Sequence, residues 1–482
     1  MNKQECAIKY VEDNYLQFNR LRHDIIADKL QVRCAHPIGD RLRAPHDTSV
    51  AGDPAEAKGE RQEQWREMTK HDINSIVCHA AQEYDANITS REVMTALQSD
   101  LIPDVHPLRE YILSLPPFTP DQPDWIDFVA SQVRVRTNNN EDTLIQQPKQ
   151  QITNNIPLAN TASGEGNNPI PSASEPSEHL NISSADRLWR GCFKKWFVAM
   201  VASWMKDEVV NHQVLVLIGK QGIFKTTWLE HLIPPHLRAY ACKLANSNDL
   251  NKDERLRIAE FGLISLDEID SMNNRELNQL KSVITATDVN ERAAYAYTKE
   301  RRVRLASFCA SGNRRDFLTD ITGNRRWLPF EVESIQNPFY TLLPYERMYA
   351  QAWALAQDPL FSYWFDLDEI EVMEQHNQYF RDESNEEQLL PILFDVPAEG
   401  RGEFMTTAQI SERLVTYGNI KKPMALSRLG MVLGAAGFRA VTRNAGSGRA
   451  RGWIVYQRDN DEIKALRRLL KDETSQLDTA IY

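Results

Sequence analysis

Residues 214–227 combine a strand pattern with a loop that contains glycine and lysine, a pairing that can bind phosphate groups. Residues 214–218 are all apolar and predict a buried parallel strand, and a helix is expected to begin at Thr226. Against the pattern G-x-x-x-x-G-K-[ST], Gly219, Lys225 and Thr226 fall in place, whereas Phe224 stands where the second glycine is expected. Such a loop offers backbone N–H groups and a helix N-terminus to a polyanion, a lysine to the β- and γ-phosphates, and a hydroxyl to Mg²⁺.

We therefore expect ATP and Mg²⁺ to bind at this loop. The residues expected to contact the nucleotide are Gly219, Lys220, Gln221, Gly222, Ile223, Phe224, Lys225, Thr226 and Thr227. Thr226 is also the expected metal ligand from this segment. Phe224 predicts weakened nucleotide affinity or turnover, because a bulky side chain at that position crowds the approach of the loop to phosphate.

A second apolar segment, residues 262–270, ends in acidic residues. An aspartate at a strand end can hold Mg²⁺ through water, and the next glutamate can polarise the attacking water. We therefore assign Asp267 to the metal and Glu268 to the general base. Asp270 is expected to be an exposed or capping carboxylate. The alternative is a surface Asp-Glu pair at a strand end, but the spacing between Lys225 and Asp267 is typical of a compact NTPase core.

A third strand is predicted over residues 303–313 and ends at Asn313, which could align the lytic water or sense the γ-phosphate. Three strands would then end in Lys-Thr, Asp-Glu and Asn. The carboxyl edge of a parallel sheet is where open α/β folds bind ligands. The joint pattern predicts an ATPase, with Lys225, Asp267, Glu268 and Asn313 in catalytic roles.

Two clusters of cations flank this predicted core. Arg325 and Arg326 lie on a glycine-containing loop before another strand, where an arginine of a ring ATPase reaches the γ-phosphate of a neighbouring subunit. A salt bridge to a surface acid is the alternative for either arginine. Residues 293–304 interleave aromatic and basic side chains and suit a hairpin that projects into a pore, where cations follow phosphates and rings stack on bases. Its expected contacts with single-stranded DNA are Tyr295, Tyr297, Lys299, Arg301 and Arg302, with Arg304 in the same basic run. A solvated basic hairpin is the competing interpretation.

The chain has 482 residues, enough for two to four domains, and a net charge of −11. That charge argues against uniform coating of nucleic acid, so DNA binding must come from local basic patches. No apolar run approaches the length of a membrane span and the N-terminus lacks a signal-peptide pattern, which predicts a cytoplasmic protein without a membrane partner. The six cysteines are scattered without a CxxC pair, so reduced thiols are expected.

Composition divides the chain into five expected parts. Residues 1–136 are expected to form a mostly helical domain, and residues 137–184, which contain no aromatic residue, a disordered linker. The ATPase domain is expected over residues 185–365 and begins with an amphipathic helix, residues 186–205. Residues 366–400 are acid-rich and predict a solvated helical connector. Residues 401–482 form the last expected domain.

The last domain is basic and has the pattern of a winged helix. Residues 414–458 contain no acid, and two predicted helices are followed by a hairpin with its turn at residues 444–448. The second helix could enter a major groove while arginines of the wing hold phosphates. The expected contacts with duplex DNA are Lys421, Lys422, Arg428, Arg443, Arg449 and Arg451. A winged helix used only for protein contact is the alternative.

Residues 186–333 resemble the P-loop domain of the virulence-associated protein E family, which is similar to superfamily 3 helicases and to the primase-helicases of poxviruses and phages. The resemblance rests on the phosphate loop at residues 219–226 and on residues 266–270, 311–315 and 322–327. Residues 107–117 and 123–126 also resemble the region before the ATPase in members carried on mobile elements. Phe224 departs from the family, which usually has glycine there.

The resemblance implies an AAA+-like hexameric ring that translocates on DNA during replication of a mobile element or prophage. The expected fold is a multidomain α/β chain with an AAA+-like P-loop ATPase core, an N-terminal helical domain and a C-terminal winged-helix-like domain. The expected function is that of an ATP-dependent DNA helicase or replication initiator. The alternative is a nucleotide-gated DNA-binding regulatory or defence factor with weak or no unwinding. Primase activity is not expected within this chain, because no paired-acid polymerase motif or zinc-ligand cluster precedes the linker, and a separate primase is a candidate partner.

Overall fold

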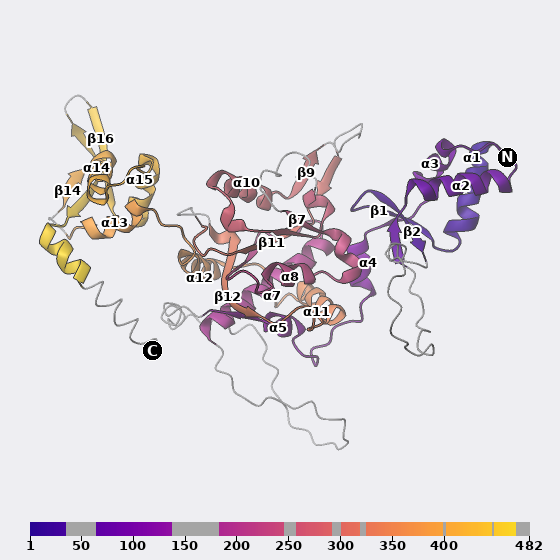
Figure 1. Ribbon diagram of the computed structural model, residues 1–482, viewed down its shortest axis with the longest axis horizontal. Helices are drawn as coiled ribbons and strands as arrows, with labels where there is room; N and C mark the ends of the chain where they lie inside the picture. Colours follow the sequence, from indigo (N-terminus) through magenta and orange to yellow (C-terminus); the bar gives the residue numbers. More distant parts are fainter. Residues whose placement is uncertain are drawn as a thin grey trace, which may run out of the picture.

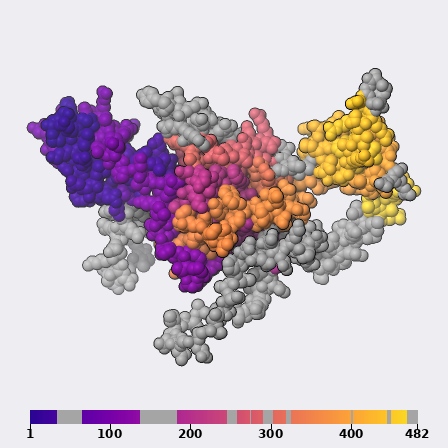
Figure 2. All heavy atoms as spheres, turned by 180° about the vertical axis from the view of Figure 1, so that it is seen from behind, coloured from indigo at the N-terminus to yellow at the C-terminus, as the bar shows by residue number. Residues whose placement is uncertain are grey.

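The computed structural model describes residues 1–34, 64–136, 183–244, 257–291, 300–318, 324–398, 402–445 and 448–468. They form a mixed α/β protein with several sheets. Figures 1 and 2 show three units in a row, with the largest in the middle. We refer to them as the N-terminal unit (residues 1–105), the central unit (residues 107–382) and the C-terminal unit (residues 384–468). The expected linker over residues 137–184 lies outside the described residues except for its last two positions.

The central unit is built on one six-stranded sheet. The strand order is β5 (Val133–Val135), β12 (Trp327–Ile335), β6 (Val214–Ile218), β11 (Ser307–Gly312), β8 (Leu263–Leu266) and β7 (Ala241–Leu244). The strands from β12 to β7 run parallel, and only β5 is antiparallel to its neighbour. All five residues of β6 are buried, as expected for a strand covered on both faces.

Alternate residues of these strands enter two hydrophobic cores on opposite faces of the sheet. Leu215 and Leu217 belong to one core, whereas Val214, Val216 and Ile218 belong to the other. The first core is covered by α4 (Pro107–Ser114), α5 (Trp125–Ala130), α7 (Ser184–Met205), α8 (Lys225–His231) and α11 (Tyr345–Gln357), and the second by α10 (Asn274–Thr285). Ser183 caps α7 by accepting a hydrogen bond from the backbone of Asp186.

The expected boundary of the N-terminal domain at residue 136 is displaced in the structure. Strand β5 pairs with β12 of the central sheet, and the indole of Trp189 on α7 donates a 2.9 Å hydrogen bond to the carbonyl of Ala130. Leu108, Ile112 and Ile126 are buried in the same core as Trp189. Residues 107–136 therefore belong to the central unit, because the apolar faces of their short helices require a partner that the first hundred residues do not provide.

The N-terminal unit is also less helical than expected. It contains α1 (Lys3–Val11), α2 (Lys70–Glu83) and α3 (Ser90–Leu97) beside a sheet of order β3 (Gln64–Glu67), β2 (Lys29–Cys34), β1 (Leu21–Asp24) and β4 (Asp104–Val105). Polar residues occupy much of these strands, so their sequence lacks a clear apolar alternation. The pairing between β1 and β2 instead fixes them as strands, with Leu21 opposite Val32.

The acid-rich segment of residues 366–400 is not one solvated connector. Its first helix, α12 (Leu367–Gln378), packs on the central unit, and His376 lies 2.7 Å from the carbonyl of Pro329. The carboxylate of Glu369 accepts two 2.6 Å bonds from Lys195. Its second helix, α13 (Asn385–Leu393), belongs to the core of the C-terminal unit. The prediction of a solvated surface therefore holds for one face of α12 only, because its opposite face is buried against the central unit.

The C-terminal unit follows α13 with β13 (Phe394–Asp395), β14 (Glu403–Met405), α14 (Thr407–Gly418), α15 (Leu426–Ala435), β15 (Arg439–Ala445) and β16 (Gly448–Gln457). Both β14 and β15 pair antiparallel with β16, and Trp453 and Val455 of β16 are buried against α14 and α15. The two helices and the hairpin therefore share one core. None of the helices that the structure describes is long and apolar enough to span a bilayer.

Candidate functional site

The loop at residues 219–224 connects the end of β6 to the start of α8, which begins one residue earlier than expected. Phe224 precedes the helix with a left-handed φ of +66°, and Gly222 has a φ of +86°. A left-handed backbone costs a non-glycine residue about 1–2 kcal/mol. The left-handed backbone at position 224 therefore explains why the G-x-x-x-x-G-K-[ST] pattern has glycine where this chain has Phe224. The Phe224 ring is half-buried and packs edge-on against Phe339 at a centroid distance of 6.4 Å.

The ammonium group of Lys225 is held by oxygen atoms of the same loop and of a neighbouring strand end. It donates to the carbonyls of Gly219 at 2.8 Å and Lys220 at 2.7 Å, and it lies 3.3 Å from Oδ1 of Asn313. Burial lowers the pKa of Lys225, and the charges of Asp270 and Asp267 oppose that shift. The side chain is buried, so a charged lysine here needs these acceptors or an anion.

The hydroxyl of Thr226 meets the acidic strand end at Asp267. Its Oγ lies 3.1 Å from Oδ1 of Asp267 and 2.9 Å from Oγ of Ser311, and Ser311 donates to the same carboxylate oxygen at 2.7 Å. Lys243 of β7 holds the other oxygen, Oδ2, at 2.9 Å. Burial raises the pKa of Asp267, but the bonds from Lys243, Ser311 and Thr226 outweigh it and hold the pKa below its ordinary value.

These oxygen atoms suit a hard divalent cation. Mg²⁺ is bound in nucleotide sites by one hydroxyl and one carboxylate together with phosphate and water, so a cage of protein carboxylates is not required. Thr226 and Asp267 present that pair 3.1 Å apart. Among the residues that the structure describes, no cluster of three or more histidine, cysteine or acidic ligands is present.

The end of β11 is joined to the acidic loop by Asp270. Its two carboxylate oxygens accept hydrogen bonds from the backbone of Asn313 at 3.1 Å and of Arg314 at 3.0 Å. A Cβ on Gly312 would lie 2.8 Å from Oδ1 of Asp270 and 2.8 Å from Cδ1 of Ile218, so a larger residue here would displace the Asp270 carboxylate. Asp270 is therefore a positioning group for Asn313, a stronger role than the exposed or capping carboxylate expected from sequence.

Glu268 follows Asp267 in a left-handed conformation with a φ of +52° and is exposed. Such strain in a non-glycine residue is concentrated at functional sites. The structure thus brings Lys225, Thr226, Asp267 and Asn313 together at the carboxyl edge of the sheet and places Glu268 on the adjoining turn. The catalytic and metal-binding roles of these residues stay predictions.

Arg325 and Arg326 lie elsewhere. They form the turn before β12, whose first residue, Trp327, pairs with Val214 at the amino end of β6. The length of β6, about 15 Å, separates this edge from the phosphate loop. Burial lowers the pKa of Arg326, and the neighbouring charge of Arg325 adds to the effect. Neither arginine lies beside the phosphate loop of its own chain.

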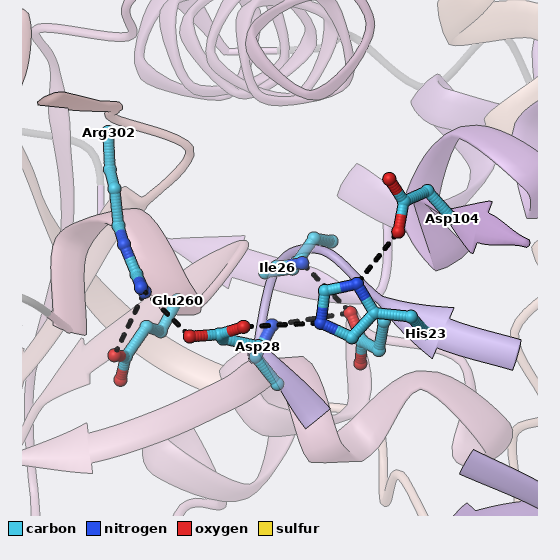
Figure 3. A network of polar contacts seen from close by, with 8 residues as sticks. His23, Ile26, Asp28, Asp104, Glu260 and Arg302 are labelled. Atoms are coloured by element: carbon cyan, nitrogen blue, oxygen red, sulfur yellow. Dashed lines mark hydrogen bonds and ion pairs between the residues drawn. The ribbon is translucent and has the colours of Figure 1, made fainter. Parts of the chain in front are cut away.

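The predicted pore hairpin is described only in its strands, β9 (Asp288–Glu291) and β10 (Glu300–Val303), which pair antiparallel. Tyr295, Tyr297 and Lys299 lie outside the described residues, as does the side chain of Arg301. Arg302 contacts two acids, Asp28 of the N-terminal unit at 3.2 Å and Glu260 at 3.7 Å (Figure 3). Asp28 in turn lies 3.1 Å from His23.

Arg304 corrects one part of the hairpin prediction. Its side chain is fully buried, and its guanidinium donates to the carbonyls of Ala306 at 3.0 Å, Asn211 at 2.9 Å and Ile284. Burial lowers its pKa to about 9, so the group remains charged at neutral pH. Arg304 anchors the base of the hairpin to the end of α10 and is inaccessible to DNA.

The basic residues of the C-terminal unit fall into two groups. Lys421 and Lys422 are exposed between α14 and α15, and Arg443, Arg449 and Arg451 are exposed on the β15–β16 hairpin. Arg428 on α15 is only partly exposed and lies 3.9 Å from the buried Glu387. The outward face of α15 also carries exposed Leu426 and Met431, which cannot form the hydrogen bonds that distinguish base pairs in the major groove. The hairpin therefore offers a phosphate contact more readily than α15 offers base recognition.

Sequence analysis gave no role in the site to four residues that lie at or near it. Ser311 and Lys243 both bond Asp267, Asp270 positions the end of β11, and Phe339 lies against the phosphate loop. Ser311 and Asp270 had a usable signal, since each lies at the carboxyl end of a predicted strand. Lys243 and Phe339 had none, because their proximity depends on sheet order and on the segment after β12.

Residues 174–388 match the model of the Virulence-associated protein E-like domain. The similarity to this domain covers 215 of the 482 residues. That match confirms the family resemblance, and it spans the phosphate loop, the acidic strand end and the arginine turn. The rest of the central sheet, β5, comes from residues before the matched segment.

Two solved structures are similar to the whole chain. The apo structure of the NrS-1 C terminal region is 10% identical and aligns over 94% of this chain and 99% of that chain, with a TM-score of 0.41. The A form apo structure of the same region is 10% identical over 91% and 98%, with a TM-score of 0.42. At these TM-scores the likeness carries no argument about fold or function. No curated protein matches the chain in sequence.

Proposed function

We propose that this chain is an ATP-dependent DNA helicase or replication initiator of a mobile element or prophage, acting as a ring-shaped P-loop motor. The observation that carries the proposal is the meeting of Lys225, Thr226, Asp267 and Asn313 at one edge of the sheet. A buried lysine beside a loop of backbone donors suits a polyanion, and the hydroxyl–carboxylate pair suits Mg²⁺. The family match supports the assignment to replication of a mobile element.

Each residue of this site has a separate role in the proposed phosphoryl transfer. Lys225 leaves its carbonyl partners and neutralises the transferred phosphate, while Asn313, fixed by Asp270, orients the attacking water. Glu268 accepts the proton of that water from its exposed turn. Mg²⁺, held by Thr226 and Asp267, would supply charge neutralisation of the phosphate oxygens. Lys243 and Ser311 keep Asp267 ionised for that purpose.

A ring is supported by the position of Arg325 and Arg326. They lie at the edge of the sheet opposite to the phosphate loop, so an arginine finger from this turn has to act on a neighbouring protomer. The proposed hexamer places each arginine turn against the loop of the next copy. Single-stranded DNA would pass along the hairpin at residues 293–304, and duplex DNA would contact the basic hairpin of the winged-helix-like C-terminal unit.

The second candidate is a nucleotide-gated DNA-binding regulatory or defence factor with weak or no unwinding. Two observations favour it: Phe224 occupies a position that suits glycine, and Arg302 of the hairpin is engaged by Asp28 of the N-terminal unit. A hairpin held in this way is less free to move with nucleotide state. Nucleotide would then control access to DNA instead of driving translocation.

The test measures steady-state ATP hydrolysis and fork unwinding for the wild type and for Lys225→Ala, Arg326→Ala and Lys70→Ala. Lys70 is an exposed lysine of the N-terminal unit and serves as the matched control. We expect both activities in the wild type and in Lys70→Ala, and their loss in the other two variants. Mixing Lys225→Ala with Arg326→Ala should restore hydrolysis, because an intact phosphate loop then meets an intact arginine turn.

Two results would count against the motor. DNA binding that depends on nucleotide but is never accompanied by unwinding supports the regulatory factor. If ATP hydrolysis does not recover when Lys225→Ala and Arg326→Ala are mixed, Arg326 does not act on a neighbouring protomer, whatever the activities of the separate variants.

A further inference from the structure

An exposed aromatic side chain lies directly beside the phosphate loop, and none of the roles assigned above uses it. Phe339, on the turn after β12, is 64% exposed. Its ring centroid lies 6.4 Å from that of Phe224 and 5.5 Å from that of His231. The interplanar angles of 81° and 86° make both contacts edge-to-face. Phe224 precedes α8 and His231 ends it, so Phe339 lies along that helix next to the loop.

The backbone around Phe339 is fixed. The side chain of Asn337 accepts a hydrogen bond from the backbone of Phe339 at 3.0 Å, and its carbonyl accepts two more from the residues that follow. Tyr345, at the start of α11, donates to the carbonyl of His231 at 2.7 Å. These hydrogen bonds hold the turn against the end of α8 and fix the backbone that carries the exposed ring of Phe339.

We propose that Phe339, supported by Phe224 and His231, is the stacking platform for the base of the bound nucleotide. This inference rests on the proposed binding of ATP at residues 219–227. A nucleoside triphosphate on that loop extends its ribose and base away from Lys225 and Thr226, and the base needs an apolar, planar partner. Every base has a π-face, so one exposed ring serves it without hydrogen-bond selection.

The platform also gives Phe224 a role. Sequence alone predicts that this side chain weakens nucleotide binding, because it replaces glycine in the loop. In the structure its ring packs edge-to-face with that of Phe339. Phe224 then costs backbone strain at the loop but holds the ring that binds the base.

The experiment compares two ligands by isothermal titration of the full chain in the presence of Mg²⁺: ATP, which has a base, and inorganic tripolyphosphate, which has none. The variants are Phe339→Ala, Phe339→Tyr and Phe224→Gly, with Tyr340→Ala as the matched control. Tyr340 is 87% exposed on the same turn. We expect Phe339→Ala to weaken the affinity for ATP roughly 5- to 150-fold, the range for loss of one base–aromatic stack, and to leave the affinity for tripolyphosphate unchanged.

Phe339→Tyr should restore ATP binding, and Tyr340→Ala should bind both ligands as the wild type does. Phe224→Gly should lower the affinity for ATP relative to tripolyphosphate, because it removes the support of Phe339 while easing the loop. Equal weakening of both ligands by Phe339→Ala, or no weakening of ATP, overturns the platform. A change of oligomeric mass in Phe339→Ala at unchanged ATP affinity also overturns it and assigns the ring to a second copy of the chain.

The outcome separates the platform from the proposed function. If the wild type binds both ligands and Phe339→Ala leaves both affinities unchanged, only the platform is ruled out. If the wild type binds neither ligand, nucleotide binding at the loop fails and the platform falls with it.

Discussion

Replacing Arg304 by methionine distinguishes a buried anchor from a DNA contact. The guanidinium is fully buried; it donates to backbone carbonyls and lies 5.1 Å from the ring centroid of Phe308. Three of them, those of Ala306, Asn211 and Ile284, lose this donor in Arg304→Met. Ile284 lies in the last turn of α10, where a cation also interacts favourably with the helix dipole.

The magnitude follows from the carbonyls of Ala306 and Asn211, because the carbonyl of Ile284 keeps its 3.3 Å contact with Nδ1 of His212. Leaving a buried acceptor without a partner costs about 1–3 kcal/mol, and methionine keeps most of the apolar stem of the side chain. At the lower end of that range, these two carbonyls make Arg304→Met destabilise the central unit by about 2 kcal/mol. Arg91→Met, on the exposed surface of α3, should stay within about 0.5 kcal/mol of the wild type.

The assay is urea unfolding followed by tryptophan fluorescence, with binding of single-stranded DNA measured on the same samples. Trp189, Trp196 and Trp204 are fully buried in the central unit and report its unfolding. The reasoning is wrong if Arg304→Met unfolds at the urea concentration of the wild type while its DNA affinity falls. That outcome would make Arg304 an exposed phosphate contact.

Two further predictions concern the phosphate loop and the N-terminal unit. Both Gly219 and Gly222 have a positive φ, so alanine at either position adds backbone strain of about 1–2 kcal/mol. A Cβ on Gly219 would also lie 2.7 Å from the backbone oxygen of Val332, whereas one on Gly222 meets nothing within 4 Å. Gly219→Ala should therefore displace β12 from β6 at a further cost of about 1–3 kcal/mol, abolish ATP binding and unfold at a lower urea concentration than Gly222→Ala; equal urea midpoints for the two would contradict the clash. Burial lowers the pKa of His23, but hydrogen bonds to Asp104 and Asp28 outweigh burial and leave the pKa above 6.5. The ion pairs of His23 with these two aspartates therefore stabilise the folded chain fully below pH 6.5, and this stabilisation is lost as the pH rises through the folded-state pKa. The difference in urea midpoint between wild type and His23→Gln should therefore shrink between about pH 6 and pH 8, and a difference that grows would refute the pairing.

The sequence by itself determined the order of the functional segments. An apolar run followed by glycine and lysine indicates a strand, a loop and a helix start, because backbone freedom and charge at these positions are local properties. The same holds for the acidic end of β8 and the polar end of β11, and for the two helices and hairpin of the C-terminal unit. Parallel strands share a carboxyl edge, so the meeting of Lys225, Thr226, Asp267 and Asn313 was predictable.

Tertiary structure decided which cations are available and which residues complete the site. Arg304 and Arg302 belong to one basic run in the sequence, yet the first is buried among carbonyls and the second contacts Asp28, more than two hundred residues away. Lys243 reaches Asp267 because β7 pairs with β8, and Phe339 reaches Phe224 because the chain turns after β12. Sheet order, burial and long-range ion pairs join segments distant in sequence, so no local pattern encodes them.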